Sequence, residues 1–157
     1  MAKFNRLHLG AGHYFWPGWN NLDEESDLKC LPYDDDSIDD IQAIHLFEHL
    51  PRLEVDQFLS EWYRVLKPGK SLVLELPSLD KMAQNIVNGE KNIRLTLLGI
   101  YGDPRDWDRQ PLMRHEWGWQ DWEIRETLEN AGFKVKFEEP VFHIIQRDMR
   151  VVGEKHG

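Results

Sequence analysis

The turn Gly10-Ala11-Gly12 is the feature that most constrains the fold of this chain. It directly follows the apolar residues Phe4, Leu7 and Leu9, which predict a short buried strand. Glycine has no Cβ, so this backbone can turn sharply and approach a ligand closely. A buried strand that ends in such a turn is typical of nucleotide-binding α/β folds. A tight turn without a ligand explains the same glycines, and that alternative stays open at this point.

The spacing from the glycine turn to the next acid distinguishes two kinds of nucleotide. Asp23 ends the next predicted strand, Trp19–Asp23, and lies thirteen residues after Gly10. A carboxylate at this place accepts hydrogen bonds from ribose hydroxyls. In dinucleotide folds the acid lies about 20 residues on, because a helix that holds the pyrophosphate intervenes. Here Pro17-Gly18 would end such a helix, so the spacing favours S-adenosylmethionine, which has no phosphate.

Five short motifs follow one another along the chain: Leu9–Gly12, Pro17–Asp23, Leu31–Asp39, His45–Leu50 and Glu61–Gly69. In this order they resemble the motifs of class I S-adenosylmethionine-dependent methyltransferases. The resemblance covers nearly the whole chain and is greatest for a compact subgroup that ends in Gly-Phe and a hairpin. The chain departs from the family in two places. Its first helix is almost deleted, and Tyr14 stands where a third glycine is expected.

The resemblance implies an α/β fold with a Rossmann-like, doubly wound and mostly parallel sheet that ends in a C-terminal antiparallel hairpin. A chain of 157 residues is long enough for one core and too short for two ordinary domains. We therefore expect residues 1–157 to form a single methyltransferase-like domain, with a lid-like insert at about 78–120. In the alternative, which stays open, the tryptophans of the insert simply pack a helix pair onto the sheet.

Hydrophobic periodicity predicts the remaining elements. Apolar residues spaced by three and four predict a helix over Glu54–Leu66. A near-continuous apolar run predicts a central strand at Ser71–Leu76. Other patterns predict strands at Ile38–Ile44, Lys134–Phe137 and Arg147–Val152, helices at Met82–Val87, Ile93–Leu98 and Gln120–Ala131, and a frayed end at Glu154–Gly157.

The resemblance also implies which residues contact the cofactor. Gly10–Gly12 would form the glycine turn, and Asp23 would bind the ribose. An acid four residues before the Leu-Pro pair, here Asp27, lies beside the adenine amino group in the family, and the Leu28 amide can donate to a ring nitrogen. His45 would lie against the cofactor at the carboxyl end of a strand. Asp27 also has a simpler explanation as a solvated loop acid.

The segment from His45 to His49 also matches the inverted zinc-protease pattern His-x-x-Glu-His. That pattern needs both histidines on one face of a long helix. Here the segment follows a predicted strand, is ended by Pro51 and has no evident third ligand. The acidic residues Asp34 to Asp40 offer no spacing that selects a metal such as calcium. We therefore expect no metal site.

The expected activity is transfer of a methyl group from S-adenosylmethionine to an oxygen or nitrogen of a small acceptor, with sugar-containing molecules among the candidates. The sulfonium is already activated, so transfer depends on alignment and on exclusion of water. A general base matters only if the acceptor must lose a proton, and His45 and His115 are the catalytic candidates. The alternative, motivated by the short glycine loop, is a non-catalytic S-adenosylmethionine-binding module that acts as a partner or regulatory subunit.

Charge and composition restrict the partners and the location. The net charge is −9, and no run of Lys and Arg is long enough to neutralise several phosphates, so we expect no nucleic-acid partner. The single cysteine, Cys30, fits a reducing compartment. No apolar stretch approaches the length of a membrane span or a signal peptide core. We therefore expect a cytoplasmic protein with no membrane partner, present as a monomer or small homo-oligomer.

Overall fold

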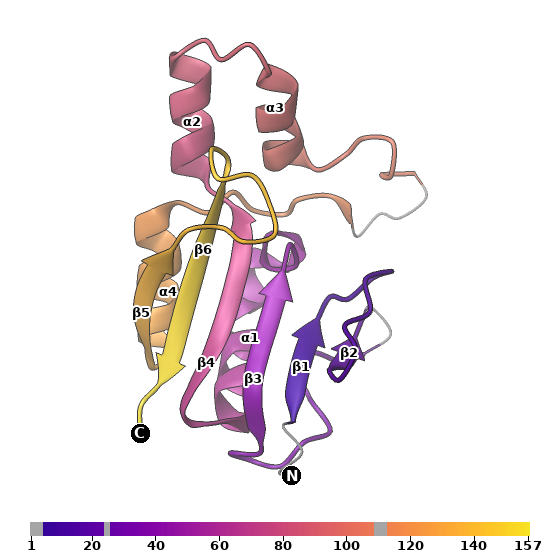
Figure 1. Cartoon of the computed structure of the whole chain (residues 1–157), viewed down its shortest axis with the longest axis vertical. Coiled ribbons are helices and arrows are strands. Elements are labelled where there is room, and N and C mark those ends of the chain that lie inside the picture. The colour runs from indigo at the N-terminus through magenta and orange to yellow at the C-terminus, as the bar shows by residue number, and fades with distance from the viewer. Residues whose placement is uncertain (1–4, 24–25, 109–112) are drawn as a thin grey trace.

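The fold is organised around one sheet. The computed structural model describes residues 5–23, 26–108 and 113–157. Within these ranges six strands follow the order β2-β1-β3-β4-β6-β5 across the sheet (Figure 1). The strands are β1 (Arg6–Leu9), β2 (Asn20–Leu22), β3 (Ile38–Ile44), β4 (Leu66–Pro77), β5 (Phe133–Glu138) and β6 (Asp148–Lys155). The helices are α1 (Val55–Val65), α2 (Leu79–Val87), α3 (Ile93–Tyr101) and α4 (Asp121–Asn130), with short 3-10 turns η1 (Phe47–His49) and η2 (Arg52–Glu54).

The first four strands of the chain form the parallel part of the sheet. β1 pairs in parallel with β2 and with β3, and β3 pairs in parallel with β4. β6 runs antiparallel to both of its neighbours, β4 and β5. The predicted Rossmann-like, mostly parallel sheet with an antiparallel C-terminal hairpin is therefore confirmed. Because β1, β2 and β3 are parallel neighbours, their carboxyl ends lie at one edge of the sheet, where ligands bind in such folds.

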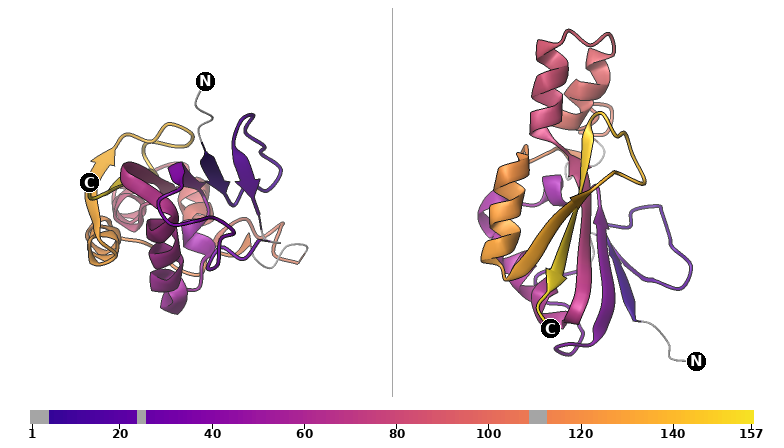
Figure 2. Two further views of the ribbon diagram at one scale, coloured as in Figure 1. Left: turned by 90° about the horizontal axis from the view of Figure 1, so that it is seen from below. Right: turned by 60° about the vertical axis from the view of Figure 1, so that its left-hand side comes forward.

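The apolar core lies between the sheet and helices α1 and α4, which cover the same face (Figure 2). The stripe of α1 is buried as its periodicity predicts, and Leu59 and Trp62 are fully buried. From β4, Leu72 and Leu74 join the same core. Each such burial stabilises the fold by about 1.5–3 kcal/mol. α1 has 11 residues, and no helix within the described ranges is long and apolar enough to cross a membrane.

The opposite face of the sheet is more polar. In β3 the half-buried Asp40 and Gln42 alternate with the buried Ile41 and Ala43, so the polar pair points away from α1. Loops 10–19 and 139–147 lie on this side of the sheet (Figure 2). They occupy part of the face that helices cover in a complete doubly wound fold.

Among the boundaries that differ from the sequence-based expectation, two have a clear physical cause. β4 begins at Leu66, directly after α1, because this residue already pairs with Ile38 across a register shift in β3. The expectation of a frayed end at Glu154–Gly157 is wrong for its first residues, since β6 runs to Lys155. The Lys155 Nζ donates hydrogen bonds to the Asp36 carboxylate and the Tyr63 carbonyl, each at 2.7 Å. These contacts hold the end of the strand in place.

The insert after β4 extends beyond the carboxyl edge of the sheet (Figure 1). Its helices α2 and α3 confirm the two weak helical predictions. Ser78 caps α2 by accepting a hydrogen bond from the Lys81 amide. α3 packs closely on α2 at Gly99. A Cβ added to this residue would lie only 2.5 Å from the Met82 sulfur, so the close approach requires glycine. The chain then returns to the sheet, where Trp119 forms a parallel bridge with Ser78.

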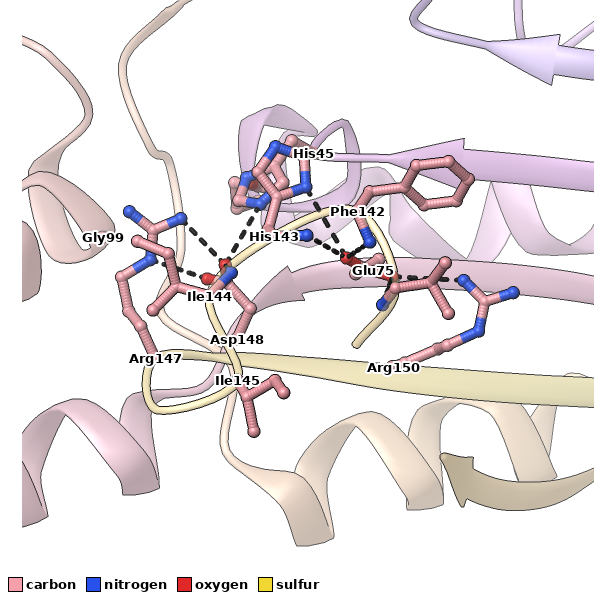
Figure 3. A network of polar contacts seen from close by, with 12 residues as sticks. His45, Glu75, Gly99, Phe142, His143, Ile144, Ile145, Arg147, Asp148 and Arg150 are labelled. Carbon is pink, nitrogen blue, oxygen red and sulfur yellow. Dashed lines mark hydrogen bonds and ion pairs between the residues drawn. The ribbon is translucent and has the colours of Figure 1, made fainter. Parts of the chain in front are cut away.

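A buried carboxylate on the polar face fixes the loop between β5 and β6. Glu75 of β4 is fully buried and accepts hydrogen bonds from the amides of Val141 at 3.0 Å, Phe142 at 2.8 Å and His143 at 2.9 Å (Figure 3). The Arg150 Nη1 donates to the same carboxylate at 3.1 Å. Burial acts to raise the pKa of Glu75, but the hydrogen bonds from His143, the loop amides and Arg150 lower it to about 2.

The first prediction concerns this carboxylate. Glu75→Gln should lower the free energy of unfolding at pH 7 by about 3 kcal/mol, because it leaves the largely buried Arg150 with only the exposed Glu138, at 3.5 Å, as an anion. The pKa of Glu75 in the folded state lies below the ordinary value of 4.5. Its stabilisation is therefore present above the unfolded-state pKa and is lost as the pH falls toward 2. Urea unfolding at pH 7 and at pH 3 measures both effects.

The exposed Glu139→Gln, in the same loop, is the matched control. Between pH 7 and pH 3 the wild type and the control should lose more stability than Glu75→Gln does. An equal loss in all three proteins would contradict the assignment.

Candidate functional site

The residues predicted to bind the cofactor follow the ends of three neighbouring parallel strands. Gly10 follows β1, Asp23 follows β2 and His45 follows β3. The last residue of β1 pairs with Leu22 of β2 and with Ala43 of β3, so the three strand ends lie side by side. The structure therefore places these residues at one edge of the sheet, which is the arrangement that the sequence predicted.

The two glycines of the turn have different surroundings. Gly10 and Gly12 both adopt positive φ, 68° and 50°, which disfavours other residues. A Cβ on Gly10 would lie 2.9 Å from the Leu46 Cβ, which is too close for real atoms. A Cβ on Gly12 would meet no atom within 4 Å. Gly10 is therefore required by the packing of the protein itself, whereas Gly12 lies beside open space.

Ala11 contributes to the turn through its backbone. It is 2% exposed, and its amide donates to the Leu22 carbonyl at 3.0 Å. Its own carbonyl accepts from the Tyr14 amide at 2.8 Å. The Ala11 amide is therefore already used within the protein, and the predicted cofactor contact of Ala11 remains a prediction.

Asn21 and a stack of aromatic rings hold the loop that replaces the first helix. Neither Asn21 nor the residues of the stack were identified from the sequence. The Asn21 side chain accepts from the Trp16 amide at 2.9 Å, donates to the Trp16 carbonyl at 3.1 Å, and lies 3.0 Å from the His8 Nδ1. The Trp16 ring stacks on His8, with centroids 4.0 Å apart, and on Phe142 at 5.2 Å. The aromatic residues directly after the glycine turn were the available signal.

The acids predicted to hold the ribose and adenine are exposed near this edge. Asp23 is exposed, and its carbonyl accepts from the Ser26 amide at 2.7 Å. The Asp27 carboxylate accepts from the Lys29 amide at 3.0 Å, which is the local turn expected of a loop acid. Leu28 is buried. The cofactor contacts of Asp23, Asp27 and Leu28 remain predictions.

His45 is held between two buried carboxylates. Its φ of 51° is unusual for a residue with a side chain. The Nδ1 lies 2.7 Å from the Glu48 Oε1. The Nε2 lies 3.7 Å from the Asp148 Oδ2 (Figure 3). Burial acts to lower the pKa of His45, but these two carboxylates raise it to about 9. His45 is therefore charged at neutral pH, and in that form it cannot accept a proton from an acceptor.

His115 reaches the same edge from the insert. Its Nδ1 lies 2.7 Å from the Gly99 carbonyl, and burial lowers the pKa of His115, which favours the neutral ring. The amides of Glu116 and Trp117 donate to the Glu48 carbonyl at 2.8 and 3.3 Å. These two bonds attach the segment after His115 to η1.

The aromatic residues of the insert have two kinds of environment. Trp119 is fully buried, with its ring centroid 5.0 Å from that of Phe47, so it packs in the core as the alternative interpretation proposed. Trp117 is 42% exposed and donates its indole N–H to Glu123 at 3.0 Å. Tyr101 is 58% exposed. Trp117 and Tyr101 are therefore the exposed aromatic residues that a lid would use.

The structure also brings together residues that the sequence analysis kept apart. One potential ligand atom each of Glu48, His49 and His115 lie within 4.8 Å of one another. We expected no metal partly because no third ligand was evident, and that premise is wrong, since the insert returns His115 to η1. η1 is a single short turn, so the long helix of the inverted zinc-protease pattern does not form. His45 faces Asp148 and Glu48 instead.

A separate groove of about 570 Å³ lies between α1 and α4. Its lining includes Asp56, Tyr63 and Glu126, and none of the residues predicted to bind the cofactor. Its lining residues come mainly from α1 and α4, and these two helices cover one face of the sheet (Figure 2). The groove is therefore distinct from the strand-end site.

Sequence comparison identifies similar proteins over part of the chain. Residues 19–74 match the family described as methyltransferase domain. Methyltransferase GfsG of Streptomyces halstedii is 40% identical over 68 residues, which make up 41% of this chain and 24% of that protein. The chain thus spans about a quarter of the length of this curated relative.

Solved structures share the fold over almost the whole chain. A SAM-dependent methyltransferase from Archaeoglobus fulgidus superposes with a TM-score of 0.62 at 18% identity, over 98% of this chain and 87% of that one. A chain from the complex between the Haloferax volcanii Trm112 methyltransferase activator and a methyltransferase gives 0.64 at 14% identity, over 99% and 84%. At these identities the likeness shows the fold alone, which is the predicted Rossmann-like, mostly parallel sheet with an antiparallel C-terminal hairpin.

The second prediction compares the two glycines. Gly12→Ala should lower the free energy of unfolding by about 1 kcal/mol through its positive φ alone. Gly10→Ala should cost about 2 kcal/mol or more, because its Cβ also meets Leu46. Urea unfolding measures both values. Leu46→Ala keeps the Leu46 Cβ but removes the Cδ1, which the added Cβ would also meet at 2.9 Å, so it should recover part of the loss in a double mutant. A Gly10→Ala cost no larger than that of Gly12→Ala would show that Leu46 does not constrain the turn.

Proposed function

We propose that the chain transfers a methyl group from S-adenosylmethionine to a small acceptor. Two findings support this proposal: the chain has the fold of class I S-adenosylmethionine-dependent methyltransferases, and residues 19–74 match the methyltransferase domain family. The observation that carries this proposal is the arrangement of Gly10, Asp23 and His45 at the carboxyl ends of β1, β2 and β3. Open α/β sheets bind ligands at such an edge.

The loop after β1 supports S-adenosylmethionine over a dinucleotide. Between Gly12 and Trp19 the chain forms turns instead of a helix. A pyrophosphate would lack the helix N-terminus that normally holds it. S-adenosylmethionine carries a sulfonium cation and an amino acid end, which loop amides and carboxylates can bind. The open space beside Gly12 gives the cofactor room to approach the backbone.

In this proposal Asp23 accepts hydrogen bonds from the ribose hydroxyls, and the Asp27–Leu28 pair faces the adenine. Both acids are exposed in the protein alone, so a ligand has direct access to them. An exposed carboxylate that gains two hydroxyl donors contributes about 1.5–3 kcal/mol to binding. Asp23 is the stronger assignment, because the Asp27 carboxylate already accepts from the Lys29 amide.

The transfer itself needs little assistance from the protein. An electron pair of the acceptor oxygen or nitrogen forms the new bond to the methyl carbon, while the electrons of the carbon–sulfur bond return to sulfur. The products are S-adenosylhomocysteine and the methylated acceptor, whose former proton leaves to solvent. Alignment and exclusion of water are the main requirements. We propose that the insert, with its exposed residues Tyr101 and Trp117, closes over the reacting methyl group.

The acceptor is proposed to be a small molecule that offers an oxygen or a nitrogen, with sugar-containing compounds among the candidates. The net charge of −9 weighs against a nucleic acid, whose affinity for proteins depends on neutralised phosphates. The same negative field attracts a cation such as the sulfonium.

The third prediction tests the cofactor. Isothermal titration with S-adenosylhomocysteine should give a Kd on the micromolar scale, about 8 kcal/mol of binding free energy. Asp23→Ala should weaken it by about 1.5–3 kcal/mol, because the ribose loses its acceptor. Asp34→Ala, an exposed acid in a different loop, should bind like the wild type. No heat at millimolar ligand, or tighter binding of a nicotinamide dinucleotide, would contradict the proposal.

A further inference from the structure

Three side chains that the proposed function does not use meet beside His45. Glu48 and His49 come from η1, and His115 comes from the segment in which the insert returns to the sheet. One potential ligand atom of each lies within 4.8 Å of the other two. The rings of His49 and His115 lie edge to face, with centroids 4.7 Å apart. One carboxylate and two imidazoles at these separations can coordinate a single metal ion.

Within the described ranges, the hydrogen bonds of the two histidines leave the same ring nitrogen, Nε2, without a partner in each. The His49 Nδ1 lies 3.0 Å from the Arg114 carbonyl, and the His115 Nδ1 lies 2.7 Å from the Gly99 carbonyl. A carbonyl oxygen can only accept, so both Nδ1 atoms carry the proton. The free electron pair of each ring, in its uncharged form, is then on Nε2. Metal-binding histidines are commonly oriented by this kind of Nδ1–H bond to a backbone carbonyl.

Glu48 supplies a buried anion that pairs with His45 but accepts no hydrogen bond from the described residues. The residue is 1% exposed, and neither carboxylate oxygen has a hydrogen-bond partner among the described residues. The His45 Nδ1 lies 2.7 Å from Oε1 as an ion pair, but it is not aligned as a hydrogen bond. A carboxylate offers about four lone-pair positions. The charged His45 offsets part of the cost of burying this carboxylate, but most of its lone-pair positions stay empty, and a second cation can fill them.

We propose that Glu48, His49 and His115 bind one divalent transition-metal ion of the zinc class. Two imidazole nitrogens favour such ions over Mg²⁺ and Ca²⁺, which prefer oxygen ligands throughout. Three protein ligands leave a coordination position for water or another oxygen ligand, as in catalytic zinc sites. His49 and His115 are half-buried, so solvent can reach this position. The site would join the insert to the sheet, since its ligands come from both.

The location of the ion relative to the cofactor rests on the proposed function. His45 lies at the end of β3 and contacts Glu48, so an ion held by Glu48 would lie close to the methyl group of a bound S-adenosylmethionine. Its open position would then face the acceptor and could bind an acceptor oxygen.

The fourth prediction is tested with zinc alone. Chelator-treated protein should take up one equivalent of Zn²⁺ in equilibrium dialysis with metal analysis. His49→Ala and His115→Ala should each weaken this binding at least about 100-fold. Loss of a residue that only orients a metal ligand costs up to about 100-fold, and loss of a ligand itself should cost no less. Glu48→Gln removes the anion with little change of shape and should weaken binding similarly. His156→Ala, an exposed histidine near the C-terminus, is the matched control and should bind like the wild type.

Circular dichroism and thermal unfolding establish that each variant is folded before its affinity is compared. Co²⁺ gives a second readout, because its visible absorption bands should appear in the wild type and be lost in His49→Ala. Failure of the wild type to bind zinc, or binding that the three ligand variants leave unchanged, would overturn the proposal. Loss in only one variant would also overturn it, since the site requires all three ligands.

The same samples separate this proposal from the proposed function. S-adenosylhomocysteine should bind to zinc-free protein, and His49→Ala should retain that binding within about threefold. Zinc binding without S-adenosylhomocysteine binding would refute the cofactor assignment alone, and the reverse result would refute the metal site alone. When both bind, Co²⁺ should shift the proton resonances of the bound S-adenosylhomocysteine in the wild type. Unshifted resonances would refute the location beside the methyl group.

Discussion

Buried carboxylates at the carboxyl edge of the sheet are the constraint on which this structure depends. Glu48, Glu75 and Asp148 are each at most 1% exposed. A buried charge costs several kcal/mol unless it is paired, so each carboxylate fixes its neighbours. Asp148 accepts from the Ile144 amide at 3.0 Å and pairs with Arg147 at 2.7 Å, while Glu75 holds the preceding loop amides (Figure 3). Polar contacts therefore shape the loop between β5 and β6, beside the strand ends where the cofactor is proposed to bind.

The polar face of the sheet also explains how the chain folds with almost no first helix. The Asn21 side chain ties the loop after the glycine turn to the end of β2, and Trp16 stacks between His8 and Phe142. Each hydrogen bond or aromatic pair contributes about 0.5–1.5 kcal/mol. Together they order a segment that other doubly wound folds order by helix formation. The turn is thus supported by side chains, and the space beside Gly12 stays open for a ligand.

Local pattern predicted the elements with regular hydrophobic repeats, such as α1 and β3, and the spacing of Gly10 and Asp23 predicted the edge where a cofactor would bind. Contacts between distant residues could not be predicted in this way. Lys155 bonds Asp36 from 119 residues away, so the polarity of the last residues alone suggested a frayed end. His115 meets η1 only because the insert folds back to the sheet, and single-sequence periodicity carries no information on that return.

The central claim is that S-adenosylmethionine binds across the carboxyl ends of β1, β2 and β3. A crystal structure of the protein with S-adenosylhomocysteine tests it most directly. We expect the ribose hydroxyls within hydrogen-bond distance of Asp23, the ligand against Gly12, and its sulfur directed toward His45. Ligand density in the groove between α1 and α4, with the strand ends empty, would contradict the claim.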